Sequence, residues 1–148
     1  MMFFETENLR DGEIRLVLHH TNPADPTRFG LPTYYFRICD EAGQTLGWCD
    51  FRVGTNEDTG YAGHVGYQIE PPFRGRHYAG KAVRLLLKLA AMHGMDHILI
   101  TCDPENAASA KTCLWAGGQP CGTVLLPADH PLYEAGVRTA ERVFRFET

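Results

Sequence analysis

The stretch from Tyr67 to Ala82, YQIEPPFRGRHYAGKA, joins the end of an expected strand to the clearest expected helix of the chain. It carries Arg74, Gly75 and Arg76 just before that helix. The first turn of a helix has unpaired N–H groups and the positive end of the helix dipole, and a glycine lets the backbone approach an anion closely. This pattern predicts a phosphate site. The alternative is a tight turn whose basic side chains are simply solvated.

Two well-known phosphate motifs are excluded at this position. The dinucleotide pattern GxGxxG does not occur in the chain. The spacing from Gly75 to Gly80 fits a nucleotide-binding P-loop, but Lys81 is followed by Ala82. Because that alanine lacks the hydroxyl group that holds magnesium, the sequence argues against an NTPase.

His64 is the candidate for proton transfer. Alternation along the expected strand 61–70 places His64 with Gly66 and Gln68, on the face opposite its apolar residues. Histidine titrates near neutral pH, as a general base for an ammonium acceptor requires. The alternative is a structural histidine that hydrogen-bonds a neighbouring loop.

Two segments resemble a known family. Residues 74–79, RGRHYA, resemble motif A of the GNAT N-acetyltransferase superfamily, whose pattern is [QR]-x-x-G-x-[GA]. Asn106 and Ser109, followed by the glycine pair at 117–118, resemble its second landmark at the start of the next helix. The resemblance covers residues 33–148. Within the superfamily, the chain resembles a bacterial predicted-acetyltransferase branch.

The resemblance implies acetyl-CoA as co-substrate and direct transfer to an amine, without a covalent enzyme intermediate. The loop backbone would hold the pyrophosphate, the strand before it would pair with the pantetheine arm, and the N–H near Ile69 would polarise the thioester. The implied acetyl-CoA residues are Gln68, Ile69, Arg74, Gly75, Arg76, His77, Tyr78, Ala79, Gly80, Asn106 and Ser109.

The chain departs from the family pattern in three places. His77 stands where the family has its central glycine, and Cys113 stands where a tyrosine often serves as general acid. The segment 21–32 contains three prolines and a glycine, so it has little room for the two helices that usually follow the first strand. In the family those two helices help to form the site for the acceptor amine. Here that site is open, completed by a second subunit, or formed by the long loop at 127–136.

The elements that would position these residues alternate in type. Periodicity and breakers predict strands and two helices in a mixed α/β fold with a mostly antiparallel sheet and flanking helices. The resemblance implies the acyl-CoA N-acyltransferase (GNAT) type of this fold, with a shortened N-terminal helical region. We expect one domain over residues 1–148. The expected strands are 13–19, 33–39, 45–53, 61–70, 97–102, 119–126 and 139–146, and the expected helices are 79–93 and 103–116, the second capped by Asp103.

Composition narrows the class of protein. The 148 residues are 44% hydrophobic and 22% charged, with a net charge of −4, so a general nucleic-acid partner is not expected. No apolar run reaches bilayer length and the first residues lack a signal pattern, so we expect a cytoplasmic protein without a membrane partner. The five cysteines include no CxxC, and Gly94 separates His93 from His97, so no metal site is expected.

The leading functional hypothesis is an acetyl-CoA-dependent N-acetyltransferase, a transferase of the acyltransferase class, with His64 as catalytic residue. The alternative is a non-catalytic acyl-CoA-binding or regulatory domain of the same fold. A third hypothesis is a structural domain whose loop binds only a loose anion. The acceptor amine has no signal in the sequence, and a homodimer, the commonest oligomer, stays open.

Overall fold

The computed structural model describes all residues from 1 to 148. Its strands form two sheets, one of four strands and one of three, and every paired ladder is antiparallel. The first sheet has the order β1 (Ile14–Asp25), β2 (Leu31–Asp40), β3 (Thr45–Arg52) and β4 (Val65–Ile69). The second has the order β5 (His97–Cys102), β7 (Ala140–Glu147) and β6 (Gln119–Leu125).

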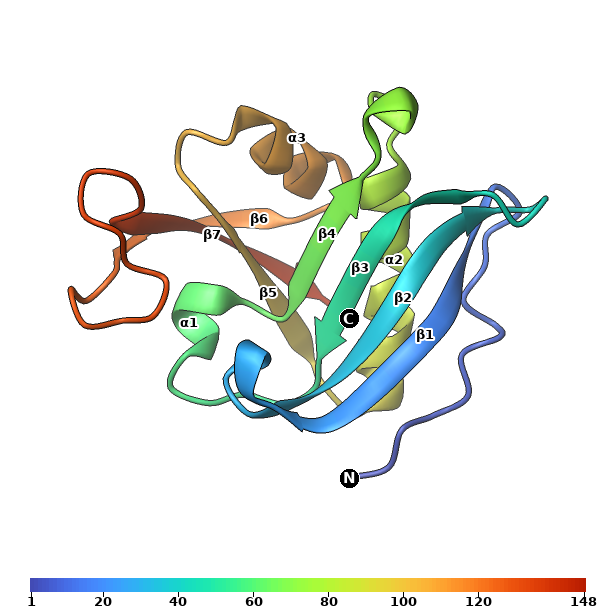
Figure 1. Cartoon of the computed structure of the whole chain (residues 1–148), viewed down its shortest axis with the longest axis horizontal. Coiled ribbons are helices and arrows are strands. Elements are labelled where there is room, and N and C mark those ends of the chain that lie inside the picture. The colour runs from blue at the N-terminus through green and yellow to red at the C-terminus, as the bar shows by residue number, and fades with distance from the viewer.

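The helices lie at separate places around the strands (Figure 1). Helix α2 (Tyr78–Met92) covers one face of the first sheet, and α3 (Ala107–Trp115) lies above the junction of the two sheets. The remaining helical segments are single turns: η1 (Pro26–Arg28), α1 (Thr59–Ala62) and η2 (Pro71–Phe73). The region between β1 and β2 therefore holds only η1. No helix is long and apolar enough to cross a membrane.

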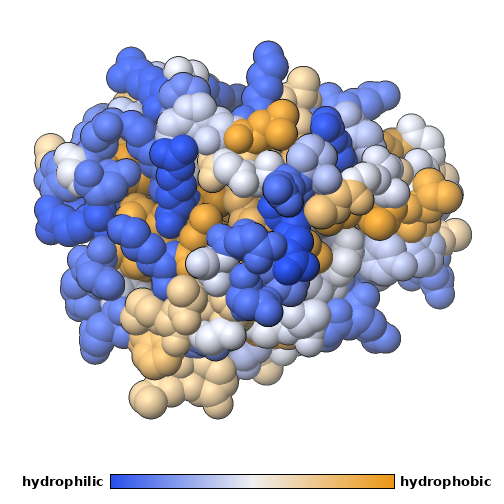
Figure 2. All heavy atoms as spheres, turned by 180° about the vertical axis from the view of Figure 1, so that it is seen from behind, coloured by the Kyte–Doolittle hydropathy of each residue, from blue (hydrophilic) through white to orange (hydrophobic).

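The core lies between α2 and the inner faces of the sheets. Helix α2 buries its apolar stripe, as its helical spacing predicts, and its other side meets solvent. Aromatic side chains of the strands pack beneath it, including Tyr34, Phe36, Phe51 and Phe144, each fully buried. Figure 2, which looks at the α2 side, shows mostly hydrophilic residues with hydrophobic ones in small patches.

Three expected boundaries are wrong, each for a local reason. Strand β1 continues to Asp25 despite Pro23, because it is an edge strand and its outer N–H groups need no partner. The segment 61–70 is not one strand: α1 ends at Ala62, and Gly63 turns the chain with a φ of 70° before β4 begins. Helix α3 begins at Ala107 rather than 103, as described below.

The long connection between β6 and β7 packs against α1. The His130 Nε2 lies 2.9 Å from Asp58 Oδ1, and its ring also contacts Phe29 and Tyr61. This contact brings residues 127–139 to the same side of the molecule as the turn between β3 and β4 (Figure 1). The connection therefore walls one flank of the region between the two sheets.

Candidate functional site

The two sheets meet at one end of the β4–β5 pair, where His64 lies just before β4. The His64 N–H donates to the Leu99 carbonyl at 2.7 Å, and the Leu99 N–H donates back to His64 Nδ1 at 2.9 Å. The other ring nitrogen lies 2.9 Å from the Gly54 carbonyl, so it carries the proton and donates. Both ring nitrogens are therefore engaged by backbone.

This geometry disagrees with a catalytic role for His64. Its side chain is 1% exposed and does not line the cleft described below. Burial lowers its pKa from 6.5 to about 4, so the ring stays neutral at physiological pH. A buried ring with no free nitrogen cannot reach an acceptor amine, and the contacts favour the structural alternative.

At the other end the strands part, and the loop before α2 lies beside the opening. The first helical hydrogen bond runs from the Lys81 N–H to the His77 carbonyl at 2.9 Å. The N–H groups of the preceding turn are consequently left without helical partners. Arg74 leads into this turn, with its Nε donating to the Ile69 carbonyl at 2.9 Å, and the rest of its guanidinium group is exposed.

His77 adopts the backbone conformation for which the family's glycine is suited. Its φ is 64°, in the left-handed region that non-glycine residues rarely occupy. The imidazole stacks on Trp115, with ring centroids 4.4 Å apart and planes 6° apart. Trp115 in turn packs on Gly80, where an added Cβ would lie 2.4 Å from the indole. These contacts fasten the start of α2 to the end of α3.

A cleft of about 790 Å³ opens between the parted strands. It is lined by most of the residues that the sequence predicted for acetyl-CoA. Two predicted residues, Arg76 and Gly80, lie outside its lining, the first exposed and the second packed against Trp115. The predicted residues in the lining are Gln68, Ile69, Arg74, Gly75, His77, Tyr78, Ala79, Asn106 and Ser109.

The wall opposite β4 comes from the end of β5 and the start of α3. The Asn106 side-chain oxygen caps α3 by accepting from the Ser109 N–H at 3.0 Å. Asn106 is therefore the cap, in place of the expected Asp103, because the turn from Asp103 to Asn106 delays the helix. Asn106 also lines the cleft.

The Tyr67 hydroxyl crosses the cleft to α3. It lies 2.6 Å from Ser109 Oγ and 3.9 Å from Cys113 Sγ. Burial raises the pKa of the Tyr67 hydroxyl, and it raises that of the fully buried Cys113 thiol to about 11. Both groups are neutral at physiological pH, so Cys113 is a poor nucleophile.

Several lining residues were not predicted from the sequence. Thr101, Cys102 and Asp103 follow from the place of β5 beside β4, which the strand pattern alone does not give. Arg138 comes from the long connection, where no spacing singled it out. Its Nε donates to the carboxylate of Glu141, a fully buried residue of β7.

The family is shown by sequence comparison. The model of the acetyltransferase (GNAT) domain matches residues 4–119, so the chain belongs to the GNAT acetyltransferase family. The resemblance read from residues 74–79 and 106–109 is thus confirmed at the level of the family. No curated protein sequence matches the chain.

Solved structures of acetyltransferases share the fold. One is the microcin C7 self-immunity acetyltransferase MccE in complex with acetyl-CoA and AMP, which is 18% identical to this chain. The match covers 78% of this chain and 61% of that chain, with a TM-score of 0.61. A second is the ribosomal-protein-S5-alanine acetyltransferase from Vibrio fischeri, which is 21% identical. The match covers 78% of this chain and 61% of that chain, with a TM-score of 0.60. A third is RimL, the ribosomal L7/L12 α-N-protein acetyltransferase, in complex with coenzyme A, which is 17% identical. The match covers 78% of this chain and 62% of that chain, with a TM-score of 0.59. This chain therefore spans about six tenths of their length.

Proposed function

We propose that this protein is an N-acetyltransferase that takes the acetyl group from acetyl-CoA and transfers it directly to an amine. The observation that carries the proposal is the coincidence of three features in one cleft: unpaired N–H groups at the start of α2, Arg74 beside them, and two parted strand edges. Family membership and the acetyl-CoA and CoA complexes of MccE and RimL support the same donor.

Different parts of the cleft suit different parts of acetyl-CoA. The N–H groups around 75–80 suit the pyrophosphate, because the helix dipole and a cationic side chain act in the same place. Strand β4 pairs with β3 on one side only, so its other edge presents free N–H and C=O groups to the cleft. Such an edge suits the two amides of a pantetheine arm, with Asn106 and Ser109 on the opposite wall.

The transfer itself needs little acid or base from the protein. The acceptor ammonium first gives its proton to water, and the amine then forms the nitrogen–carbon bond as the carbon–sulfur bond breaks. Coenzyme A leaves as a thiolate and takes up the second proton of the nitrogen, directly or through water. Because a thiol has a pKa of about 8.5, coenzyme A is a good leaving group without a phenol at position 113. Catalysis then depends on positioning and on the N–H near Ile69, which polarises the thioester.

The experiment measures binding and turnover separately. Acetyl-CoA at about 100 times its Kd should stabilise the fold by about 2.7 kcal/mol, which raises the Tm by roughly 5–10 °C. Release of the coenzyme A thiol in the presence of primary amines reports turnover. Absence of both effects would contradict the proposal, and binding without turnover on any amine would support the non-catalytic acyl-CoA-binding domain instead.

A further inference from the structure

Three basic side chains with a permanent charge line the cleft: Arg74, Lys111 and Arg138. Two of them already donate to the protein. Arg74 Nε donates to the Ile69 carbonyl at 2.9 Å, and Arg138 Nε donates to the carboxylate of the buried Glu141. Lys111 is exposed and makes no ion pair or side-chain hydrogen bond with the rest of the chain. The ammonium group of Lys111 is therefore the cation of the cleft that a ligand can take without displacing a protein partner.

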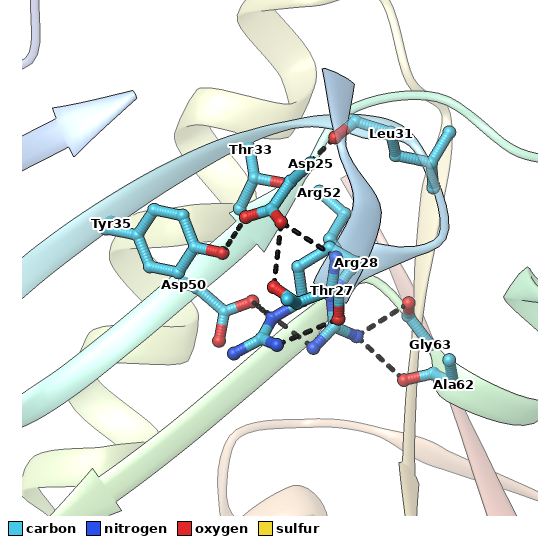
Figure 3. A network of polar contacts seen from close by, with 10 residues as sticks. All are labelled: Asp25, Thr27, Arg28, Leu31, Thr33, Tyr35, Asp50, Arg52, Ala62 and Gly63. Carbon is cyan, nitrogen blue, oxygen red and sulfur yellow. Dashed lines mark hydrogen bonds and ion pairs between the residues drawn. The ribbon is translucent and has the colours of Figure 1, made fainter. Parts of the chain in front are cut away.

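Two more arginines lie beside the strands of the first sheet but belong to a polar network of their own (Figure 3). Arg28 Nε donates to Asp50 Oδ2 at 3.0 Å, and Arg52 lies 3.2 Å from the same oxygen. Asp25, which caps the turn that holds Arg28, supplies a second negative charge. Because two carboxylates balance two guanidinium groups, this network offers no free positive charge to a ligand.

The basic residues of α2 near its start are also engaged outside the cleft. Lys81 Nζ donates to Glu13, far from it in the sequence. Arg84 donates to the Trp115 carbonyl at 3.1 Å, and its guanidinium group lies over the indole ring. Neither side chain lines the cleft. Lys111 is thus left as the free cation that faces the cleft from α3.

Lys111 lies on the face of α3 that meets the loop before α2. Trp115, four residues further along, is its neighbour on that face, and the indole stacks on His77 with centroids 4.4 Å apart. Ala108, three residues before Lys111, and the adjacent Thr112 also line the cleft. Lys111 is therefore about one helical turn, roughly 5.4 Å, from the contact that joins α3 to the start of α2. A flexible four-carbon side chain spans that distance.

Acetyl-CoA has one phosphate more than the loop before α2 accounts for. The N–H groups around 75–80 and Arg74 suit the pyrophosphate, as argued above. The remaining phosphate is a monoester on the 3′ oxygen of the ribose, and near neutral pH such a group carries a charge of about −1.5 to −2. An ammonium group with three rotatable donors suits this terminal phosphate. The free cation of the cleft and the remaining anion of the ligand therefore match in charge.

We propose that Lys111 binds the 3′-phosphate of acetyl-CoA and makes the protein select coenzyme A over its 3′-dephospho form. This inference rests on the acetyltransferase function proposed above and adds a specificity-determining residue for the donor. The 3′-phosphate is at the opposite end of the donor from the thioester, so Lys111 contributes to affinity and not to the transfer step. Its loss should consequently raise the KM for acetyl-CoA and leave kcat unchanged.

The test compares coenzyme A with 3′-dephospho-coenzyme A, which differs only in this phosphate, by titration calorimetry. We expect the wild type to bind coenzyme A about five- to tenfold more tightly at low salt, as an exposed ion pair with a dianion allows. Lys111→Gln should weaken the binding of coenzyme A by the same factor and leave that of the dephospho form unchanged. Lys111→Arg keeps the charge and should retain most of the preference.

The matched control is Lys88→Gln, which removes an exposed charge of α2 outside the lining of the cleft and should leave the preference at its wild-type value. Equal affinity of the wild type for the two coenzymes would overturn the inference, and so would a preference that survives in Lys111→Gln. In both cases continued turnover of acetyl-CoA keeps the proposed function. A wild type that neither binds nor turns over acetyl-CoA would overturn both.

Discussion

The backbone groups at the two ends of the β4–β5 pair differ in whether they have hydrogen-bond partners. At the closed end, His64 and Leu99 exchange hydrogen bonds, and the buried imidazole leaves no polar atom unpaired. At the open end, the strand edges part and the first turn of α2 keeps its N–H groups unpaired beside the cleft. Fewer than twenty residues separate His64 from Lys81.

Because of this difference, the closed end contributes to the stability of the fold and the open end is available for ligand binding, although both lie in one short segment. A buried polar group costs free energy unless it is paired, so the closed end contributes to folding only while every partner is present. Unpaired groups that remain in contact with solvent cost little and stay available for a ligand. Variants at the closed end should therefore change stability, and variants at the open end should change affinity.

The largest effect is expected from His64→Ala. The change leaves the Leu99 N–H and the Gly54 carbonyl without partners and opens a cavity, so the free energy of unfolding should fall by about 3 kcal/mol. Urea unfolding at neutral pH measures it. Acetyl-CoA affinity of the folded fraction should stay unchanged. A variant as stable as the wild type but without turnover would return His64 to a catalytic role.

The pH dependence of stability should carry the signature of the same histidine. Its pKa falls from 6.5 to about 4 on folding, so between these values the unfolded chain binds a proton that the folded one does not. Stability should therefore be fully present above about pH 7 and fall as the pH drops, by about 3 kcal/mol at pH 4. His64→Gln, which does not titrate, should give a flatter profile in urea unfolding between pH 7.5 and 4.5. Equal slopes for both proteins would contradict the assignment.

Gly80→Ala tests the contact that fastens α2 to α3. The new methyl group would lie 2.4 Å from the Trp115 ring, which must move. We expect a loss of about 1–2 kcal/mol, because overpacking outweighs the better helix propensity of alanine. Thermal unfolding, with tryptophan fluorescence as a probe of Trp115, measures both consequences. A stabilised variant would show that this packing is looser than described.

Arg74→Glu should weaken acetyl-CoA binding about tenfold at low salt and leave the Tm without ligand unchanged, because it places a negative charge beside the phosphates. Arg76→Glu is the matched control, since Arg76 lies outside the lining of the cleft. It should weaken binding no more than about threefold. Titration calorimetry at two salt concentrations measures both. An equal loss in the two variants would mean that only general charge matters.

The smallest effect is expected from His77→Gly. Glycine removes the backbone strain at φ 64° but loses the stack on Trp115, and these opposing changes are each about 1 kcal/mol. Stability and acetyl-CoA affinity should both stay close to the wild-type values. A tenfold loss of affinity would show that the imidazole itself contacts the phosphates.

The sequence predicted the open end of the strand pair better than the closed end. Helix α2 and the loop before it follow from local signals: apolar spacing, a glycine and basic residues in a short range. The contact of His64 with Leu99 spans 35 residues, so no local pattern reveals whether that histidine faces solvent or another strand.

The same limit explains the other differences. Asp103 and Asn106 are both good caps, and only the turn between them decides which one begins α3. Arg138 reaches the cleft because His130 anchors the long connection to Asp58, a contact across 72 residues. Sequence patterns describe single elements well, whereas the far wall of a cleft depends on how distant elements pack.

The most direct test of the account is a map of backbone amide protection on addition of acetyl-CoA, by NMR or hydrogen exchange. The account predicts shifts and added protection at the N–H groups of residues 75–80 and at 68–69 of β4, with His64 and Leu99 unchanged. Unchanged amides at 75–80 in the presence of bound acetyl-CoA would contradict it.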